Sequence, residues 1–231
     1  MSLTTLVQAL VSGALLGCFY TLMALAFSLI FGVTRALNLA HGELVVLGGY
    51  LGYWLWAGSG LHPVFLLPVA AAALLPLGLL WERLINRIPE PKELQSLVLT
   101  FGLSLLLQNM MAALWRGEYR LIASPSLTES VALGGIRLNQ GRILVAAISL
   151  AAVGALHFAL TRTRWGRAVR AASLDREAAA LLGINVDRAT QTTFLLAMGL
   201  AGAAGVLFAT LHYLHPAAGI DLTLLAVILT L

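Results

Sequence analysis

Charged residues are scarce in this chain of 231 residues: they make up 10% of it, whereas hydrophobic residues make up 60%. Soluble domains carry about a quarter charged residues, so this composition excludes that class and, with a mean hydropathy of +0.91, places the chain in a lipid bilayer. Cysteine is also almost absent. The single Cys18 excludes an intrachain disulfide, and a small buried hydrophobe is its simplest interpretation.

The chain also lacks the motifs of nucleotide and metal chemistry. It contains no G-x-x-x-x-G-K-[ST] and no other phosphate cradle, so we expect this chain to bind no nucleotide or other cofactor. His212 and His215 form an H-x-x-H pair accompanied only by Asp221, and two ligands do not close a zinc site, so we expect no metal. The net charge of +4 predicts no nucleic acid partner, because the basic residues lie between apolar segments.

Long apolar runs take the place of these missing features. A helix crosses the hydrocarbon core in about 20 residues, and uncharged or nearly uncharged stretches recur at 6–33, 44–57, 63–81, 94–115, 143–161 and 194–214, with a seventh beginning near Leu222. We therefore expect an all-α polytopic transmembrane helix bundle with six complete spans and a partial seventh. All five tryptophans lie near the ends of these stretches, where an amphipathic indole prefers the headgroup region.

The basic residues predict which side each connection faces. One alternating set of connections holds ten of them, and the other holds four: Arg116, Arg120, Arg137 and Arg142. Because cytoplasmic loops are enriched in Lys and Arg, the N-terminus is predicted to lie outside and the basic segment 162–188 inside. The external connection 116–142 contains Ser124, Pro125 and an alternating stretch, SVALGGIRL, that favours a small hairpin.

The second apolar stretch is short, and the residues before it are polar. The approach 35–43 holds a cation, a histidine and a carboxylate, so this segment is expected to be broken or re-entrant, with non-helical backbone sheltered by neighbouring helices. His41 and Glu43 are functional candidates, because ionisable groups in a membrane usually line a cavity or pair with each other. The alternative is an interfacial turn on the cytoplasmic side.

Other polar and small residues lie within the spans. Gln108 and Asn109 are interpreted as interhelical hydrogen-bonding groups or as cavity lining. With Asn38, His41 and Glu43 they form our set of candidate translocation-path or gating residues. Small residues at four-residue spacing (Gly13 and Gly17, Gly48 and Gly52, Ala201 and Gly205) predict close helix packing.

The basic segment 162–188 carries six of the fourteen basic residues. Residues 168–182 can form a short helix across the membrane surface, with Gly183 as its stop. Two functions are open for it. The segment can dock on a nucleotide-hydrolysing partner through Leu174, Ala178, Leu181 and Leu182, with Arg170, Arg176 and Glu177 setting register, or it can be held to anionic lipid by its arginines.

Several dispersed motifs resemble one family of transporters. Glu177, Ala178, Ala179 and Gly183 stand in the spacing E-A-A-x-x-x-G, which resembles the loop that ABC importer permeases press into their ATPase subunits. Residues 37–43 (LNLAHGE) followed by Gly48 and Gly49, residues 97–109 (LVLTFGLSLLLQN) and residues 181–187 (LLGINVD) resemble the inner-membrane permeases of branched-chain amino acid ABC importers, the LivH type. Leu39 replaces an aromatic residue of that pattern, and the leucine-proline ending of the family's loop is missing.

This resemblance implies a single permease domain over 1–231 with a cytoplasmic coupling loop at 162–193. Its ATPase-docking residues would be Arg170, Leu174, Arg176, Glu177, Ala178, Ala179, Leu182 and Gly183. The function implied is translocation of branched-chain amino acids or a related small polar solute across a bacterial inner (plasma) membrane, by a transport subunit that is not itself an enzyme. The partners implied are cytoplasmic ABC ATPases, a second permease subunit, a periplasmic or extracellular solute-binding protein and the lipid bilayer.

Three further points follow from the resemblance. Such permeases continue for about two more helices, through a G-G-x-G-S-like segment, so the chain is expected to be a C-terminally truncated member. A secondary transporter is the first alternative, but the spans are almost free of the mid-membrane charge that ion coupling uses. An intramembrane metal-dependent enzyme is the second, but neither three convergent ligands nor a nucleophile and base can be assembled.

Overall fold

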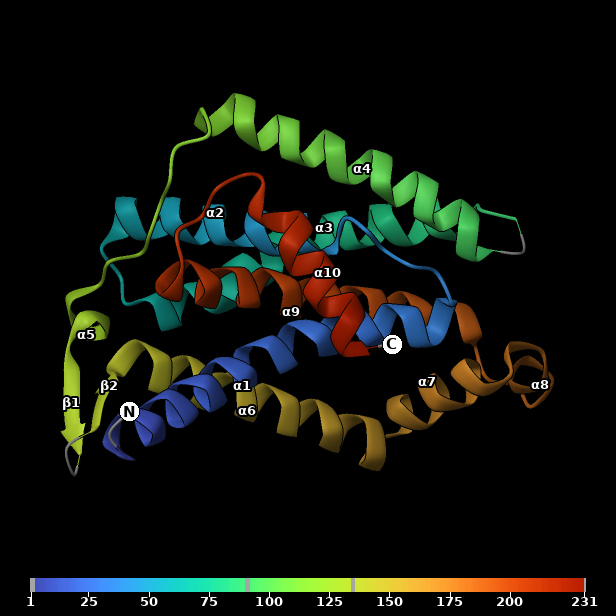
Figure 1. The fold of residues 1–231 in the computed structure, drawn as a ribbon. Helices are drawn as coiled ribbons and strands as arrows, with labels where there is room; N and C mark the ends of the chain where they lie inside the picture. The colour runs from blue at the N-terminus through green and yellow to red at the C-terminus, as the bar shows by residue number, and fades with distance from the viewer. Residues whose placement is uncertain (1–2, 90–91, 134–135, 231) are drawn as a thin grey trace.

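Five helices within residues 3–89, 92–133 and 136–230, which the computed structural model describes, are long and apolar enough to cross a membrane. They are α1 (Leu3–Thr34), α3 (Pro63–Asn86), α4 (Lys92–Trp115), α6 (Gln140–Arg162) and α9 (Val186–Leu211). A bilayer offers no water to unpaired backbone groups, so runs of this length form helices, which satisfy those groups internally. The prediction of an all-α polytopic bundle is confirmed (Figure 1).

The shorter elements lie between or beside these helices. They are α2 (His41–Ser59), α5 (Pro125–Thr128), β1 (Ser130–Leu133), β2 (Ile136–Asn139), α7 (Arg164–Leu174), α8 (Arg176–Leu181) and α10 (Ala218–Thr230). The strands β1 and β2 pair antiparallel, with Ser130 opposite Asn139. The hairpin predicted for the connection 116–142 is therefore confirmed.

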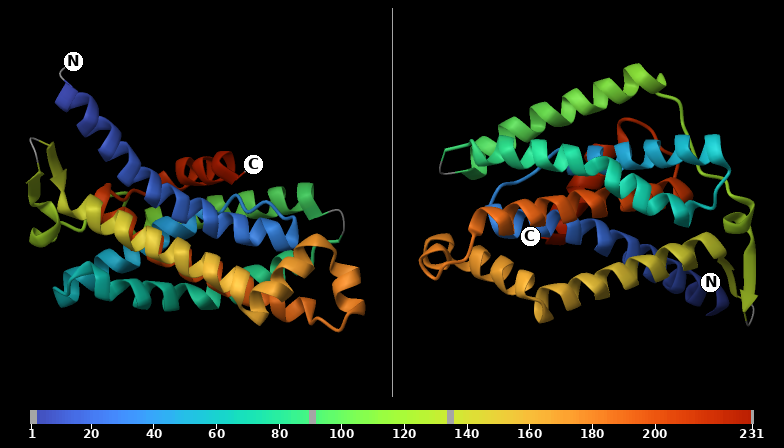
Figure 2. Two further views of the ribbon diagram at one scale, coloured as in Figure 1. Left: turned by 90° about the horizontal axis from the view of Figure 1, so that it is seen from below. Right: turned by 180° about the vertical axis from the view of Figure 1, so that it is seen from behind.

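Helix α9 forms the centre of the bundle, because α1, α2 and α3 all pack against it. Helix α10 packs on α1 and α2 and crosses them obliquely (Figure 1). Helix α4 lies at the edge (Figures 1 and 2), packs mainly on α2, and leaves several large apolar side chains exposed, Leu94, Val98 and Phe101 among them. Exposed apolar helix faces are expected in lipid, where lipid tails replace the protein core as their environment.

Glycines bring α2 and α9 into backbone contact. A Cβ on Gly48 would stand 2.7 Å from the Cα of Gly202, and one on Gly52 would stand 2.7 Å from a methyl group of Val206. Van der Waals contact of this kind drives helix association in lipid, so two of the predicted small-residue pairs serve close packing. Gly13 and Gly17 differ, because no described atom lies within 4 Å of a Cβ at either position.

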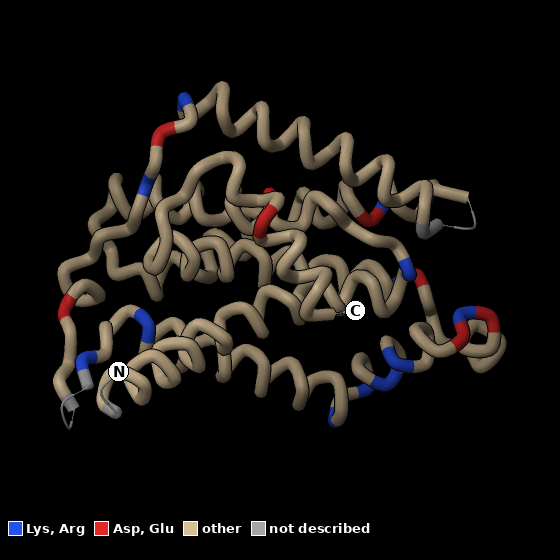
Figure 3. The backbone as a smooth tube through the Cα atoms, viewed as in Figure 1, with Lys and Arg blue, Asp and Glu red and all other residues tan. Residues whose placement is uncertain are grey.

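Charged side chains gather at the two ends of the bundle and leave a band between them almost free of charge (Figure 3). One end holds the N-terminus and the hairpin, which are tied by a hydrogen bond from Gln8 Nε2 to the Arg137 carbonyl (3.4 Å). The other end holds α7 and α8 (Figure 1). The sequence assigns successive connections to alternating sides of the membrane, and the arrangement of the helices is consistent with that assignment.

Two details of the predicted spans differ in the structure. The second stretch was expected at about 44–57, and α2 begins three residues earlier at His41 and ends two residues later at Ser59. Trp81 lies near the end of α3, and its ring is buried, with its Nε1 donating to Oδ1 of Asn38 (3.3 Å). Both differences arise because the segment before α2 lies inside the bundle, where its polar groups need partners.

Candidate functional site

The segment 35–40 between α1 and α2 has no helical structure and turns back into the bundle. Its direction is fixed by His41, whose Nε2 lies 3.3 Å from the Met23 carbonyl oxygen. Met23 precedes the end of α1 at Thr34 by eleven residues, or about 16 Å of helix. The expected non-helical backbone sheltered by neighbouring helices is thus present, but it precedes α2, which is itself one unbroken helix and starts at the level of the middle of α1. We call residues 35–40 the re-entrant segment.

Side chains of neighbouring helices satisfy the backbone of this segment. The amide of Leu37 donates to Oγ of Ser96 (3.2 Å), and that of Leu39 donates to Oγ1 of Thr100 (3.0 Å). Thr100 Oγ1 also donates to the Leu37 carbonyl (3.1 Å). Irregular backbone is tolerated at membrane depth only when it is buried in protein with its polar groups paired, and α4 supplies those partners.

The polar residues of α4 recur every fourth position: Ser96, Thr100, Ser104 and Gln108. Residues four apart share one face of a helix, so this stripe faces the re-entrant segment over most of its length. Ser96, Thr100 and Ser104 are buried, whereas Gln108 is half-buried. The stripe explains how a helix so exposed to lipid stays attached to the bundle.

Helix α10 supports the segment from another side. Oγ1 of Thr223 accepts from the Gly42 amide (2.8 Å) and donates to the Leu39 carbonyl (3.1 Å). The backbone of Gly219 lies against Gly42 and Glu43 so closely that a Cβ on Gly219 would stand 2.7 Å from Cδ of Glu43. The first turns of α2 and α10 therefore meet inside the bundle.

The candidates Asn38, His41 and Glu43 are all buried in this region. Oδ1 of Asn38 accepts from the Ala40 amide (3.1 Å) and from Trp81, which gives it a structural role in shaping the turn. Within the described residues, neither carboxyl oxygen of Glu43 accepts a hydrogen bond from His41 or from any other group. The Ser104 hydroxyl faces that carboxyl. Burial beside the middle of α1 is not what the interfacial turn would give, and a gating role for His41 and Glu43 stays a prediction.

Gln108 and Asn109 line a different part of the molecule. With Tyr119, His215 and the 216–217 backbone they border a cavity of about 480 Å³, which we call the amide cavity. A second cavity of about 340 Å³ shares Tyr119 and His215, whose rings lie 5.2 Å apart. We call it the α10 cavity, and its other lining residues include Tyr20, Phe208, His212, Asp221, Leu222 and Leu225. The sequence candidates thus separate into a buried group and a cavity-lining group.

Sequence reasoning missed most residues of the α10 cavity. Asp221 was considered only as a metal ligand, and Tyr20 and Tyr119 were not singled out. Asp221 interrupts a run that is otherwise apolar from Ala217 to Leu231 apart from threonine and glycine, and this interruption was the available signal. Among the described residues no three His, Cys, Asp or Glu side chains are placed to hold a metal ion.

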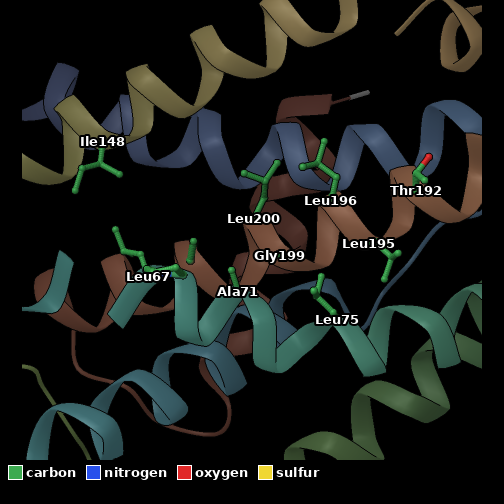
Figure 4. A pocket seen from close by; sticks show the side chains of 11 residues that line it. Leu67, Ala71, Leu75, Ile148, Thr192, Leu195, Leu196, Gly199 and Leu200 are labelled. Atoms are coloured by element: carbon green, nitrogen blue, oxygen red, sulfur yellow. The ribbon is translucent and has the colours of Figure 1, made fainter. Parts of the chain in front are cut away.

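An apolar groove lies between α3 and α6 over α9 and has a volume of about 590 Å³. Figure 4 shows Leu67, Ala71 and Leu75 on one side of it and Ile148 on the other. Thr192 is its one hydroxyl-bearing lining residue, and that oxygen already donates to the Arg188 carbonyl (2.8 Å) and accepts from Trp165 (2.8 Å). A polar solute finds almost no partner there, so we do not place the translocation path in this groove.

The basic segment forms two short helices rather than the single helix expected over 168–182. Helix α7 ends at Leu174, and Asp175 takes an extended conformation whose side chain accepts from the Ala178 amide to cap α8 (2.9 Å). Aspartate is among the preferred N-cap residues, so the sequence LDRE at 174–177 could have predicted a helix end followed by a new helix start. Gly183 has φ +80°, which confirms it as the left-handed residue that stops α8.

The apolar side chains at the tip of this segment project into solvent. Leu174, Leu181 and Leu182 are 86%, 89% and 82% exposed, and Arg170, Glu177, Ala178 and Gly183 are exposed with them. Exposed leucines clustered on a surface are typical of a site that contacts another protein or a membrane surface. Six of the eight predicted docking residues are therefore accessible.

The other two predicted docking residues face the bundle. Ala179 is buried. Arg176 directs its Nη1 to the Val33 carbonyl at the end of α1 (3.1 Å) and to Oγ1 of Thr190 on α9 (3.4 Å). Arg176 therefore joins α8 to two long helices instead of standing free.

Comparison with known proteins identifies what the chain is similar to. The family described as branched-chain amino acid transport system / permease component matches residues 9–231. The high-affinity branched-chain amino acid transport system permease protein LivH of Salmonella typhimurium is 31% identical over 215 residues, which cover 87% of this chain and 69% of that protein. LivH of Escherichia coli K12 shows the same identity and coverage.

More distant relatives carry related names. The permease protein BraD of Pseudomonas aeruginosa is 29% identical over 215 residues, which cover 87% of this chain and 69% of BraD. A probable branched-chain amino acid transport permease of Methanocaldococcus jannaschii is 26% identical over 214 residues, which cover 89% of this chain and 67% of that protein. No solved structure matches the chain.

Proposed function

The chain belongs to the permease family of branched-chain amino acid transport systems, and from that membership we propose that it is the membrane-spanning subunit of an ABC importer for branched-chain amino acids or a related small polar solute. The match over residues 9–231 is the observation that carries the proposal. It agrees with the bundle of long apolar helices and with the location of a multi-pass protein in the bacterial inner membrane.

The topology we propose has the N-terminus and the hairpin outside and α7 and α8 in the cytoplasm. Ten of the fourteen basic residues lie in connections on the α7–α8 side, and such an excess marks cytoplasmic loops. We also propose that α2, although too polar at its start to count among the five apolar spans, completes a sixth crossing together with the re-entrant segment. Helix α10 would be the beginning of the seventh.

Residues 162–193 would form the coupling loop of a single permease domain. The exposed leucines of its tip would enter a cleft on a cytoplasmic ATPase, while Arg176 transmits the displacement to the ends of α1 and α9. The end of α1 leads directly into the re-entrant segment. A movement of α8 can therefore reach the buried residues Asn38, His41 and Glu43 without passing through lipid-facing helices. We propose that the solute site opens alternately to the two sides of the membrane, and that this connection transmits the movement of the ATPases to the bundle.

The partners follow from this assignment. ATP hydrolysis would reside in separate ATPase subunits, and this chain would act as a transport subunit without enzymatic activity or a cofactor of its own. A second permease subunit and an external solute-binding protein would complete the importer. The exposed faces of α1 and α4 would contact lipid or the second permease.

Reconstitution tests the proposed function. The chain, a second permease, the ATPases and the binding protein are placed in liposomes, and entry of labelled leucine is measured with and without ATP. We expect uptake that requires both ATP and the binding protein. Uptake driven by an ion gradient without ATP would instead establish a secondary transporter and overturn the proposal.

Labelling in intact cells tests the topology. Single cysteines at Ser173 and Ser126, in a chain with Cys18 replaced by alanine, are treated with a membrane-impermeant maleimide in intact cells. We expect Ser126→Cys to react from outside and Ser173→Cys only after the membrane is opened. The opposite pattern would invert the assignment of the two ends.

A further inference from the structure

Asp221 is an exposed carboxylate at a depth where carboxylates are rare. It lies in the first turn of α10 and lines the α10 cavity beside Tyr20. Tyr20 precedes the end of α1 by fourteen residues, or about 21 Å of helix. The other end of α10 is held at a similar level, because Oγ1 of Thr230 donates to the Ala24 carbonyl (3.3 Å).

A carboxylate at this level is costly in lipid, so it must face water or a cation. In the described parts of the chain, Asp221 has no hydrogen bond and no ion pair. The nearby His212 does not supply the missing charge, because within the described residues no ion pair joins it to Asp221. The α10 cavity therefore holds an anionic group whose partner is not part of the cavity.

The remaining walls of the cavity suit an aliphatic group. Phe208, Leu222 and Leu225 supply apolar side chains, and Tyr20 and Tyr119 also line the cavity. The volume of about 340 Å³ lies at the lower end of the range of small-ligand pockets. An anionic group beside an aliphatic wall matches a small cation that carries a hydrocarbon chain.

We propose that the α10 cavity binds the transported amino acid, with Asp221 taking the α-ammonium group and Phe208, Leu222 and Leu225 contacting the branched side chain. The proposal rests on the proposed function, which supplies an amino acid as substrate. The adjoining amide cavity, which presents Gln108 and Asn109, gives the α-carboxylate side of the same zwitterion amide N–H donors. Tyr119 and His215 line both cavities, so the two cavities meet at these side chains.

A purely structural role for Asp221 has to be separated from this one. A carboxylate in the first turn of a helix is favoured by the helix dipole, so Asp221→Asn could weaken α10 without touching a ligand. Ligand selectivity separates the two roles. A loss of helix stability weakens all ligands alike, whereas loss of an ammonium partner weakens only ligands that carry an ammonium group.

The experiment measures binding of tritiated leucine to the purified complex of permeases and ATPases, without ATP and without the binding protein. The competitors are isopentylamine, which keeps the ammonium group, and 4-methylpentanoate, which keeps the carboxylate. For the unaltered chain we expect competition by both. In Asp221→Asn we expect leucine binding to fall at least tenfold, with isopentylamine losing its effect and 4-methylpentanoate retaining it. Glu129→Gln, which removes an exposed carboxylate near the hairpin, should bind leucine as the unaltered chain does.

Three results would overturn the inference: no leucine binding by the unaltered complex, unchanged binding in Asp221→Asn, or equal weakening of both competitors. ATP-dependent leucine uptake by the complete importer is measured alongside. Uptake without an Asp221 effect defeats this inference alone. Absence of any branched-chain amino acid uptake defeats the proposed function as well.

Discussion

The re-entrant segment with the start of α2 (residues 35–43) and the α7–α8 segment are both polar interruptions of an apolar chain, and they solve the same problem in opposite ways. The first buries most of its polar groups, and three of its backbone amides, those of Leu37, Leu39 and Gly42, donate to side chains of α4 or α10. The second exposes three leucines and turns an arginine inward. Two polar interruptions thus give a buried internal support in one place and an exposed apolar tip in the other.

The difference shows what decides the role of a polar stretch in this protein. Inside the bundle an unpaired backbone group costs several kcal/mol, so small hydroxyl side chains on neighbouring helices determine the path of the segment. At the bundle end water satisfies the backbone, and shape is set instead by local capping residues such as Asp175. Substitutions should therefore affect folding in the first region and association in the second.

The largest effect is expected where α2 and α9 touch. A side chain at Gly205 would overlap the Val45 carbonyl and the Gly49 amide, and neither backbone can move without separating the helices. We expect Gly205→Val to cost on the order of 3 kcal/mol or more and to remove most folded protein. Gly13→Val, where no described atom lies within 4 Å of the new Cβ, is the control. Size-exclusion profiles after detergent extraction measure the outcome, and equal yields would contradict the packing argument.

The next largest effect is expected on the association of the α7–α8 segment with the ATPase. Gly183→Leu forces a left-handed backbone on a branched residue, at a cost of about 1–2 kcal/mol, and disturbs the turn in which the Ile184 amide donates to the Ala179 carbonyl (3.1 Å). We expect about tenfold less ATPase to co-purify with the chain. Gly60→Leu imposes similar strain, because Gly60 has φ +66°, but at the opposite end, and should leave co-purification unchanged. If both variants retained the ATPase, lipid anchoring would become the better account of α7 and α8.

Much of this architecture could be predicted from the sequence, because long apolar runs leave the chain few alternatives. The five spans, the hairpin, the re-entrant turn and Gly183 as a helix stop all follow from periodicity and local propensity. The break at Asp175 was also local, and we missed it by giving the alanines more weight than the cap. The partners of Trp81 and Thr223 could not be predicted, because they depend on which helices become neighbours.

The same distinction applies to the candidate site. The sequence identified His41 and Glu43 as unusual, because ionisable residues next to an apolar run can be recognised without a structure, and both are buried. Their depth became clear only from the contact with Met23. The α10 cavity joins Tyr20, Tyr119 and Asp221, residues separated by about a hundred positions, and no local pattern links them.

A smaller effect is expected at Arg176, the residue that connects the two regions through the end of α1. Arg176→Gln removes a charged hydrogen bond to the Val33 carbonyl, worth about 1 kcal/mol at this half-buried site after solvent screening. We expect ATP hydrolysis to persist while leucine transported per ATP falls severalfold. Arg167→Gln, an exposed arginine of α7, should keep the ratio. An unchanged ratio in Arg176→Gln would mean that α8 moves the bundle by another contact.

The smallest effect is expected from removing one hydroxyl oxygen that supports the re-entrant segment. Thr223→Val keeps the shape of the side chain but leaves the Gly42 amide without the oxygen that accepts from it and the Leu39 carbonyl without its donor. Hydrogen bonds between membrane helices average about 0.6 kcal/mol and reach about 1.7, so we expect a loss of roughly 1 kcal/mol for the pair, seen as a lower thermal unfolding midpoint in detergent. Thr210→Val loses only a bond to Leu207 in its own helix, whose carbonyl belongs to the α9 ladder, and should shift the midpoint less. Equal shifts of the midpoint would show that packing alone holds the re-entrant segment. Hydrogen bonding inside the bundle and hydration at its end would then no longer explain why the re-entrant segment and the α7–α8 segment differ.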